Sequence, residues 1–351
     1  MRLRSLWSVG LLGSLAALSV TDAAAVQCAR TVTATIVAHD QPTVFNRLGA
    51  QNPNWMMYSL ERDLVNKTTG VPCTAGGACS AGNVMLRPDK RTRPLALRVA
   101  EGDCLTVNFK NYLAGPGTGN NPNQGATGAN PNNAIQGNLI NDDQVAERTA
   151  GFHPQGLERI GSIGSDGSFV GNNPNAANCT GAAVHGSMVE PGGTCTYQYY
   201  APHEGAYSVT NLGATMGSDQ QGGTASTGLF GLVAVQPRGA KIYRGQVTEE
   251  EMRLATTGTT GTGQPIINYE AVYPNVAPWT LEGKAGLPIL NTITPAGVIV
   301  HQEINAVIAG PNPDGSFPAS TYPLESVSKR VPSLPNRLEP FRDFASIFHD
   351  E

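Results

Sequence analysis

Apolar and polar residues alternate along several short stretches of the chain, a pattern typical of β-strands with one buried face. Because successive side chains of a strand point to opposite faces, apolar residues two apart share a face. Four stretches show this alternation: TVTATIV (31–37), LALRV (95–99), LTVNF (105–109) and CTYQY (195–199). A fifth stretch, LFGLVAV (229–235), is almost wholly apolar and predicts a central strand covered on both faces.

No stretch keeps a helical period for long, and the chain contains 41 Gly and 25 Pro. This combination predicts an all-β fold. A turn is expected at EGD (101–103), and a single helical turn at TEEEMRL (248–254) with Thr248 as its N-cap. The long loops at 114–133 and 164–181 are rich in Asn, Gly and Pro, so we expect them to cross the surface or cover a site.

Residues 1–25 have the pattern of a signal peptide. Arg2 and Arg4 precede the apolar run LWSVGLLGSLAALSV, and Ala23 to Ala25 supply the small residues of a cleavage site. This run is shorter than the ~20 residues that a membrane-spanning helix needs, so we expect no transmembrane segment. The mature chain is therefore expected to be exported, and to be periplasmic, on the cell surface or secreted. An uncleaved N-terminal anchor is the alternative.

Composition divides the rest of the chain into three segments. Residues 26–240 hold the alternating strands and are expected to form one domain. Residues 241–340 are rich in Thr, Gly and Pro, and we expect a linker with little regular structure. Residues 341–351 end in DFASIFHDE, which echoes TATIVAHDQ near the mature N-terminus. We therefore expect 341–351 to start a second copy of the domain, in a longer protein.

Six cysteines in an exported chain predict disulfide bonds, because that compartment is oxidising. Six cysteines allow 15 pairings, so the connectivity stays open. Cys73 and Cys79 are the first pair we expect, because only five residues separate them. The next pairs are Cys179 with Cys195 and Cys28 with Cys104. A cysteine thiolate bound to a type 1 copper is disfavoured, because no cysteine is closely followed by the His and Met of such a site.

Charge and histidine spacing exclude several classes of function. The net charge is −4 with Lys and Arg scattered along the chain, which argues against a nucleic-acid partner. No two of the six histidines are two or four residues apart, so no local metal-binding pair exists. Nothing resembles a nucleophile elbow or an ordered catalytic triad, so no catalytic residue is predicted.

Four motifs occur in a fixed order along the chain: RVAEGDCLTVNFKNYL (98–113), GFHPQGL (151–157), EPGGTCTYQYYAPHEGAYSVTNLG (190–213) and STGLFGLVAVQP (226–237). Together they resemble the first, N-terminal cupredoxin domain of multicopper oxidases over roughly residues 30–240. The segments MYSLERDL (57–64) and FRDFASIFHDE (341–351) are most similar to the large bacterial members associated with manganese oxidation. The resemblance implies a cupredoxin-like Greek-key β-sandwich, followed by the linker and the first strand of a second cupredoxin domain.

The resemblance also implies a type of chemistry. In that family a mononuclear copper takes electrons from the substrate, and a three-copper cluster reduces dioxygen to water. Eight imidazoles from four His-x-His motifs hold the cluster, two of these motifs lying in the first domain. Alternation along a strand explains the spacing, because residues two apart direct both imidazoles into one cavity.

Only one of the four cluster ligands expected in this domain is present. His153 and Gln155 stand at the two positions of the first motif, and Thr210 and Leu212 stand at those of the second. An amide or hydroxyl is a much poorer copper ligand than imidazole, and Leu212 has no lone pair at all. Copper is therefore expected in the longer protein to which this chain would belong, and not in this chain alone. His153 is either a metal ligand in a larger assembly or a hydrogen-bonded structural residue.

Two functions remain open. The first is the N-terminal part of an exported multicopper oxidase that oxidises a metal ion or a phenolic substrate. Its partners would be further cupredoxin domains of the same polypeptide, and this chain alone would be inactive. The second is a secreted cupredoxin-like module that binds or scaffolds without catalysis.

Overall fold

The computed structural model describes residues 26–44, 46–52, 55–114, 148–168, 170, 178–180, 184–185, 187–212, 228–318 and 339–348. The expected signal peptide, most of the loop at 114–133, and His349 lie outside these described residues.

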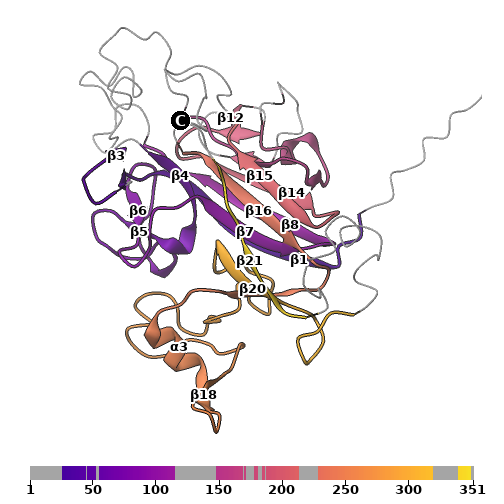
Figure 1. Ribbon diagram of the computed structural model, residues 1–351. Coiled ribbons are helices and arrows are strands. Elements are labelled where there is room, and N and C mark those ends of the chain that lie inside the picture. The colour runs from indigo at the N-terminus through magenta and orange to yellow at the C-terminus, as the bar shows by residue number, and fades with distance from the viewer. Residues whose placement is uncertain are drawn as a thin grey trace, which may run out of the picture.

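Two mixed β-sheets pack against each other and form the larger part of the described structure (Figure 1). The first has the strand order β10-β14-β8-β1-β4, with β1 parallel to β8 and the other neighbours antiparallel. Its strands are β1 (Arg30–Asp40), β4 (Met56–Leu60), β8 (Asp103–Asn111), β10 (Glu158–Arg159) and β14 (Thr194–Tyr200), with β11 (Cys179–Thr180) also paired to β14.

The second sheet has the order β7-β16-β15-β9, with β7 parallel to β16 and the other neighbours antiparallel. Its strands are β7 (Leu95–Ala100), β9 (His153–Pro154), β15 (Gly205–Thr210) and β16 (Phe230–Gln236). Four two-stranded antiparallel sheets are also present: β2 (Thr43–Val44) with β3 (Gln51–Asn52), β5 (Leu64–Asn66) with β6 (Val84–Leu86), β12 (Val184–His185) with β13 (Met188–Val189), and β18 (Thr256–Thr259) with β19 (Pro265–Ile267). The architecture is an all-β, cupredoxin-like sandwich, as expected.

The alternating stretches of the sequence form strands with the expected buried faces. In β1 the side chains of Val32, Ala34 and Ile36 are buried, while Thr33 and Thr35 between them are half-buried. The same alternation holds in β8 and β14, and β16 is buried along its whole length. The core between the sheets is aromatic, with Tyr58, Phe109, Phe152, Tyr197 and Tyr199 in contact as a chain of rings.

Strand β7 departs from the expected pattern, because all six of its residues are buried. The polar face of this strand is covered by residues 302–304, and Arg98 is only 1% exposed. Its guanidinium donates hydrogen bonds to the backbone oxygens of Glu303 and Ile304, each at 2.8 Å, and to the Asp343 carboxylate. A position that alternation assigns to solvent is therefore a buried ionic contact.

Residues 241–318 hold more regular structure than the linker we expected. They contain β17 (Lys241–Arg244), α3 (Glu249–Ala255), the β18–β19 hairpin and β20 (Asn305–Ala309). They also have their own apolar cluster, in which Tyr243, Tyr273, Trp279, Ile289 and Leu290 pack together. These residues are far apart in sequence and have no common period, so their packing was not visible in the pattern.

The strand expected to open a second domain pairs with this same segment. Strand β21 (Phe341–Phe344) is antiparallel to β20, in a three-stranded sheet of order β17-β20-β21. In Figure 1 this sheet lies below the sandwich, and α3 and β18 lie lower still. The division of the chain into domain, linker and second domain remains a prediction.

Helix α3 begins at the expected residue. Thr248 Oγ1 accepts a hydrogen bond from the Glu251 backbone N–H, and the Glu251 carboxylate accepts one from the Thr248 backbone N–H. This reciprocal arrangement satisfies two backbone donors that a helix N-terminus leaves unpaired.

Substituting Thr248→Ala is expected to lower the free energy of unfolding by about 1 kcal/mol, because one helix N-terminal N–H loses its acceptor. Urea denaturation followed by circular dichroism measures the change. Thr248→Ser keeps the hydroxyl and should stay close to wild type, so equal losses in both variants would contradict the capping role.

All six cysteines form disulfide bonds, as predicted. The pairs are Cys28–Cys104, Cys73–Cys79 and Cys179–Cys195. Cys28 precedes β1 and Cys104 lies in its parallel neighbour β8, where Thr31 and Cys104 are in register. Cys179 and Cys195 are direct cross-strand partners in β11 and β14.

Candidate functional site

Three of the four positions that the sequence assigned to copper ligands lie together at one end of the second sheet. Strands β9 and β15 are antiparallel neighbours, with His153 opposite Thr210. The Gln155 backbone N–H donates to the Ser208 oxygen at 2.8 Å, which continues the pairing by one residue. Leu212 follows β15 and is half-buried.

His153 is held by a hydrogen bond on one side of its ring. Its side chain is 25% exposed, and Nδ1 donates to the backbone oxygen of Asp166 at 2.6 Å. The Asp166 carboxylate lies 3.6 Å from the same nitrogen. This contact fixes the ring orientation and places the proton on Nδ1, which leaves the Nε2 lone pair for another contact.

The residues beside His153 do not fit a copper centre. Gln155 Nε2 donates to Thr210 Oγ1 at 3.3 Å, and Gln155 Oε1 accepts from Ser208 Oγ at 3.2 Å. These polar groups satisfy one another, and they are poor copper ligands beside imidazole. Among the residues that the structure describes, no group of three or more His, Cys, Asp or Glu side chains is placed to hold a metal ion.

His39 and His301 have structural contacts within the fold. His39 is fully buried between β1 and β4, where Nε2 lies 2.9 Å from Ser59 Oγ and Nδ1 lies 3.2 Å from the Asp40 oxygen. Burial lowers the pKa of His39 to about 4, against a smaller opposing effect of Asp40. His301 is buried, and its Nε2 donates to the Pro288 oxygen at 2.8 Å. Both rings are therefore neutral at pH 7.

The buried His39 should make stability depend on pH. The pKa of its ring is about 4 in the folded chain, against an ordinary value of 6.5, so the unfolded chain binds more protons between these two values. Stability is therefore complete above pH 6.5 and decreases as the pH falls toward 4. We expect His39 to contribute a loss of about 1.5 kcal/mol between pH 6.5 and pH 5. Urea denaturation of wild type and His39→Gln at both pH values measures this. An identical pH dependence in the two proteins would contradict it.

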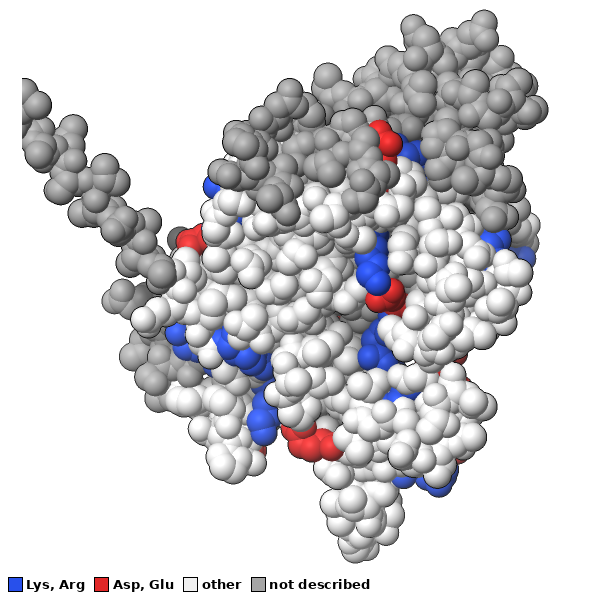
Figure 2. All heavy atoms as spheres, turned by 180° about the vertical axis from the view of Figure 1, so that it is seen from behind, with Lys and Arg blue, Asp and Glu red and all other residues white. Residues whose placement is uncertain are grey.

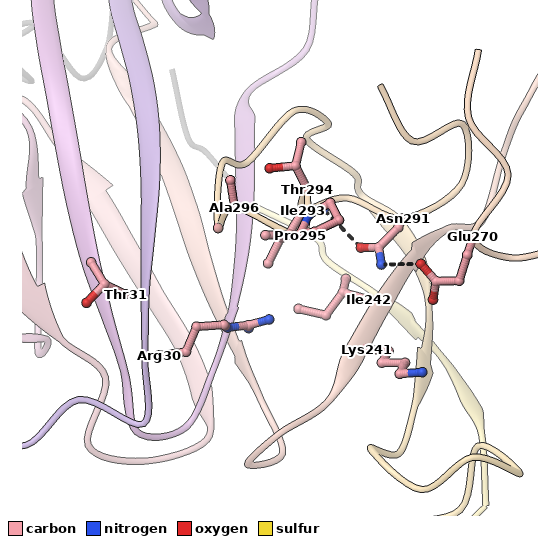
Figure 3. Close-up of a pocket in the computed structure, with 11 residues that line it drawn as sticks. Arg30, Thr31, Lys241, Ile242, Glu270, Asn291, Ile293, Thr294, Pro295 and Ala296 are labelled. Atoms are coloured by element: carbon pink, nitrogen blue, oxygen red, sulfur yellow. Dashed lines mark hydrogen bonds between the residues drawn. The ribbon is translucent and has the colours of Figure 1, made fainter. Parts of the chain in front are cut away.

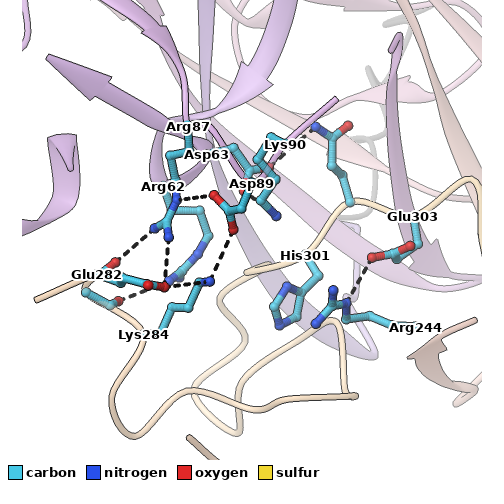
Figure 4. Close-up of polar contacts among 12 residues, drawn as sticks. Arg62, Asp63, Arg87, Asp89, Lys90, Arg244, Glu282, Lys284, His301 and Glu303 are labelled. Carbon is cyan, nitrogen blue, oxygen red and sulfur yellow. Dashed lines mark hydrogen bonds and ion pairs between the residues drawn. The ribbon is translucent and has the colours of Figure 1, made fainter. Parts of the chain in front are cut away.

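A charged cavity of about 740 Å³ lies where the sandwich meets residues 244–303. One wall comes from Arg62, Asp63 and residues 86–93, and the facing wall comes from residues 244–251, 273–287 and 301–303. Figure 4 shows the network on one side of it, where Arg87 contacts Asp89 and Glu282, and Lys284 contacts the same two carboxylates. The sequence prediction missed this cavity. The available signal was RPDKRTR (87–93), which holds five charged residues in a chain that is only 14% charged.

Arg244 anchors the other side of the cavity. It contacts Glu303 at 3.0 Å and Glu251 at 3.1 Å, and Tyr273 donates a hydrogen bond to Glu251. Burial alone would raise the pKa of Glu251, but Arg244 and the hydrogen bonds lower it to about 2. Burial raises the pKa of Glu303, because desolvation there exceeds the attraction of Arg244. These buried pairs hold the segment after residue 241 together, and the pairs Arg87–Glu282 and Lys284–Asp89 join that segment to the sandwich.

A second cavity, of about 520 Å³, lies between β1 and the start of β17 (Figure 3). Two of its three charged lining residues have partners: Arg30 pairs with Asp103 at 2.6 Å, and Glu270 accepts hydrogen bonds from Tyr243 and Asn291. The third, Lys241, is exposed at the start of β17. Nothing in this arrangement identifies a ligand.

The surface outside these cavities carries few charges. On the face shown in Figure 2, Lys and Arg form small separate groups, some beside Asp or Glu, on a mostly uncharged surface. No helix in the described part of the chain has the length and apolar character needed to cross a membrane.

Comparison with known proteins gives similarity at the level of solved structures only. No family model and no curated protein matches the sequence. A copper nitrite reductase from Nitrosomonas europaea has a TM-score of 0.30 and 13% identity over 59% of this chain. A multi-copper oxidase from Pseudomonas Thermotolerans has a TM-score of 0.28 and 17% identity over 59% of this chain. A laccase from Pediococcus acidilactici Pa5930 has a TM-score of 0.32 and 12% identity over 69% of this chain.

This chain spans 42%, 29% and 34% of those three proteins, respectively. At these scores the similarity supports no conclusion about function, which has to come from the chain's own residues.

Proposed function

We propose that this chain is the N-terminal part of an exported multicopper oxidase, which oxidises a metal ion or a phenolic substrate and reduces dioxygen. The observation that carries the proposal is that His153, Gln155 and Thr210 lie next to one another in the structure. Gln155 and Thr210 are 55 residues apart in the sequence, yet the pairing of β9 with β15 brings their side chains into contact. This placement is the one that a pair of His-x-His motifs needs to line a single cavity.

The domain itself would have a structural role in that enzyme. Only His153 keeps an imidazole, so the copper ions would be held by other domains of the same polypeptide. Copper supplies one-electron oxidation and dioxygen reduction in such a protein. The residues of this chain would instead supply a rigid sandwich against which the copper-binding domains pack. A relationship to the large manganese-oxidase-like members is part of this proposal.

The disulfide bonds support export. Three pairs among six cysteines are stable in an oxidising compartment and rare in the cytosol. Together with the signal-peptide pattern of residues 1–25, they support a periplasmic, cell-surface or secreted protein.

The mature protein, isolated from the cells that make it, tests the proposal. We expect a polypeptide longer than 351 residues that contains copper and consumes oxygen when a phenol or Mn²⁺ is added. An isolated protein that ends at Glu351, contains no copper and consumes no oxygen would contradict the proposal.

One observation favours the alternative, a cupredoxin-like module without catalysis. The Gln155 side chain, which stands at an expected ligand position, is hydrogen-bonded to both Ser208 and Thr210. A module of this kind would show no oxidase activity at any length of polypeptide, so the same isolation distinguishes the two functions.

A further inference from the structure

The charged cavity contains more positive charge than its own carboxylates neutralise. Seven Lys and Arg residues line it, and four of them form ion pairs with lining carboxylates: Arg87, Lys90, Arg244 and Lys284. The five carboxylates in these pairs are Asp63, Asp89, Glu251, Glu282 and Glu303. The sixth lining carboxylate, Glu250, pairs with Arg253 outside the cavity.

The other three cations are Arg62, Arg91 and Arg93, and none forms a direct ion pair among the described residues. The charge of Asp63 acts on Arg62, and that of Glu303 acts on Arg93, without direct contact. Arg62 donates one hydrogen bond to the Gly283 oxygen at 3.2 Å, and Arg93 donates one to the Gln302 oxygen at 3.1 Å. A guanidinium has five N–H donors, so most of the donors of these residues remain available. Arg91 is exposed at the rim.

The surroundings make this excess of charge costly without an anion. Burial lowers the pKa of Arg62, and the nearby Arg87 charge lowers it further, while Asp63 opposes the change. A charge that is partly removed from water and lacks a counter-ion is unfavourable. Guanidinium groups bind carboxylate and phosphate oxygens in a bidentate manner, so such an anion would use the available donors.

We infer that this cavity is a binding site for a small organic anion that carries two or more carboxylate or phosphate groups. Its volume of about 740 Å³ is within the range of small-molecule sites, roughly 300–1,000 Å³. Arg62, Arg91 and Arg93 would hold the anionic groups. The paired network of Arg87, Lys284 and Arg244 seen in Figure 4 would form the rigid walls.

Such a ligand would also connect the two parts of the chain. Arg62, Arg91 and Arg93 belong to the sandwich side, whereas their backbone acceptors Gly283 and Gln302 belong to the segment after residue 241. Binding should therefore stabilise the folded chain and raise its melting temperature in proportion to occupancy.

Isothermal titration calorimetry on the full chain tests the inference with citrate and with pyrophosphate as probes. We expect one site per chain, binding that weakens at high ionic strength, and much weaker binding of acetate. Tighter binding of citrate would identify polycarboxylates as the ligand class, and tighter binding of pyrophosphate would identify phosphates. No saturable binding of either probe to the folded chain would overturn the inference.

Two variants locate the site. Arg91→Gln and Arg93→Gln are each expected to weaken binding about tenfold, because a charged hydrogen-bond donor is lost. Arg91 is exposed, so this variant should fold normally, and circular dichroism verifies that it does. Arg159→Gln removes an exposed cation on β10 that does not line the cavity and is the matched control. Affinities that are equal in all three variants and wild type would show that the anion binds elsewhere, and would overturn the assignment.

Discussion

Replacing Arg98 by methionine is expected to lower the free energy of unfolding by about 3–5 kcal/mol. The guanidinium is almost completely buried and connects β7 to two backbone oxygens of residues 303 and 304. It also pairs with Asp343 in β21, which receives a second hydrogen bond from Gln236 at 2.9 Å. Methionine fills similar space but leaves the Glu303 oxygen without its donor and the Asp343 carboxylate without its cation, and both losses are unfavourable next to a buried strand.

Urea denaturation measures this loss, and Arg253→Met is the matched control. Arg253 is 71% exposed and pairs only with Glu250 on α3, so its loss should change stability by less than about 0.5 kcal/mol. Equal effects of the two substitutions would show that Arg98 does not connect the sandwich to the following segment.

Removing the Cys28–Cys104 disulfide should have the second large effect. The two residues are 76 apart in sequence, and closing a loop of that length in the unfolded chain contributes about 4 kcal/mol of stability. Cys73 and Cys79 are 6 apart, and the same loop-closure entropy gives about 2 kcal/mol for their bond.

Thermal and urea denaturation of two double variants test this difference. Cys28→Ala/Cys104→Ala is expected to be clearly less stable than Cys73→Ala/Cys79→Ala. The reverse order, or no loss in the first variant, would contradict a stabilising cross-link between β1 and β8.

The alternation of apolar and polar residues in the sequence predicted most of the strands of the sandwich. It placed Val32, Ala34 and Ile36 on the buried face of β1, and the apolar run at 229–235 correctly indicated a covered strand. Period alone could not predict the burial of Arg98, because its cover comes from residues about 205 positions later in the chain. Contacts at that separation leave no trace in a local pattern.

The region after residue 241 was predicted least well. Its strands are short, and its apolar cluster depends on Tyr243, Tyr273 and Trp279, which follow no regular spacing. The cavity was missed for the same reason, since its walls combine five separate segments. Only the charged run at 87–93 was visible in advance, and a charged run by itself usually indicates a solvated surface.

The residues that the resemblance assigns to the first two copper motifs are neighbours in the structure. His153 and Thr210 are direct cross-strand neighbours, and Gln155 contacts Thr210. The sequence could not show that Gln155 and Ser208 also bond to each other, or that Asp166 fixes the His153 ring. The Asp166 contact depends on the loop after β10, which local pattern does not position.

We propose that this chain is part of a multicopper oxidase and does not itself build a copper centre. The most direct measurement is the copper content of the purified 351-residue chain after incubation with Cu²⁺ and removal of unbound metal, together with its visible absorption spectrum. We expect far less than one copper per chain, no blue absorption band, and the same values in His153→Ala. One or more copper ions per chain with a blue band, lost in His153→Ala, would contradict the account.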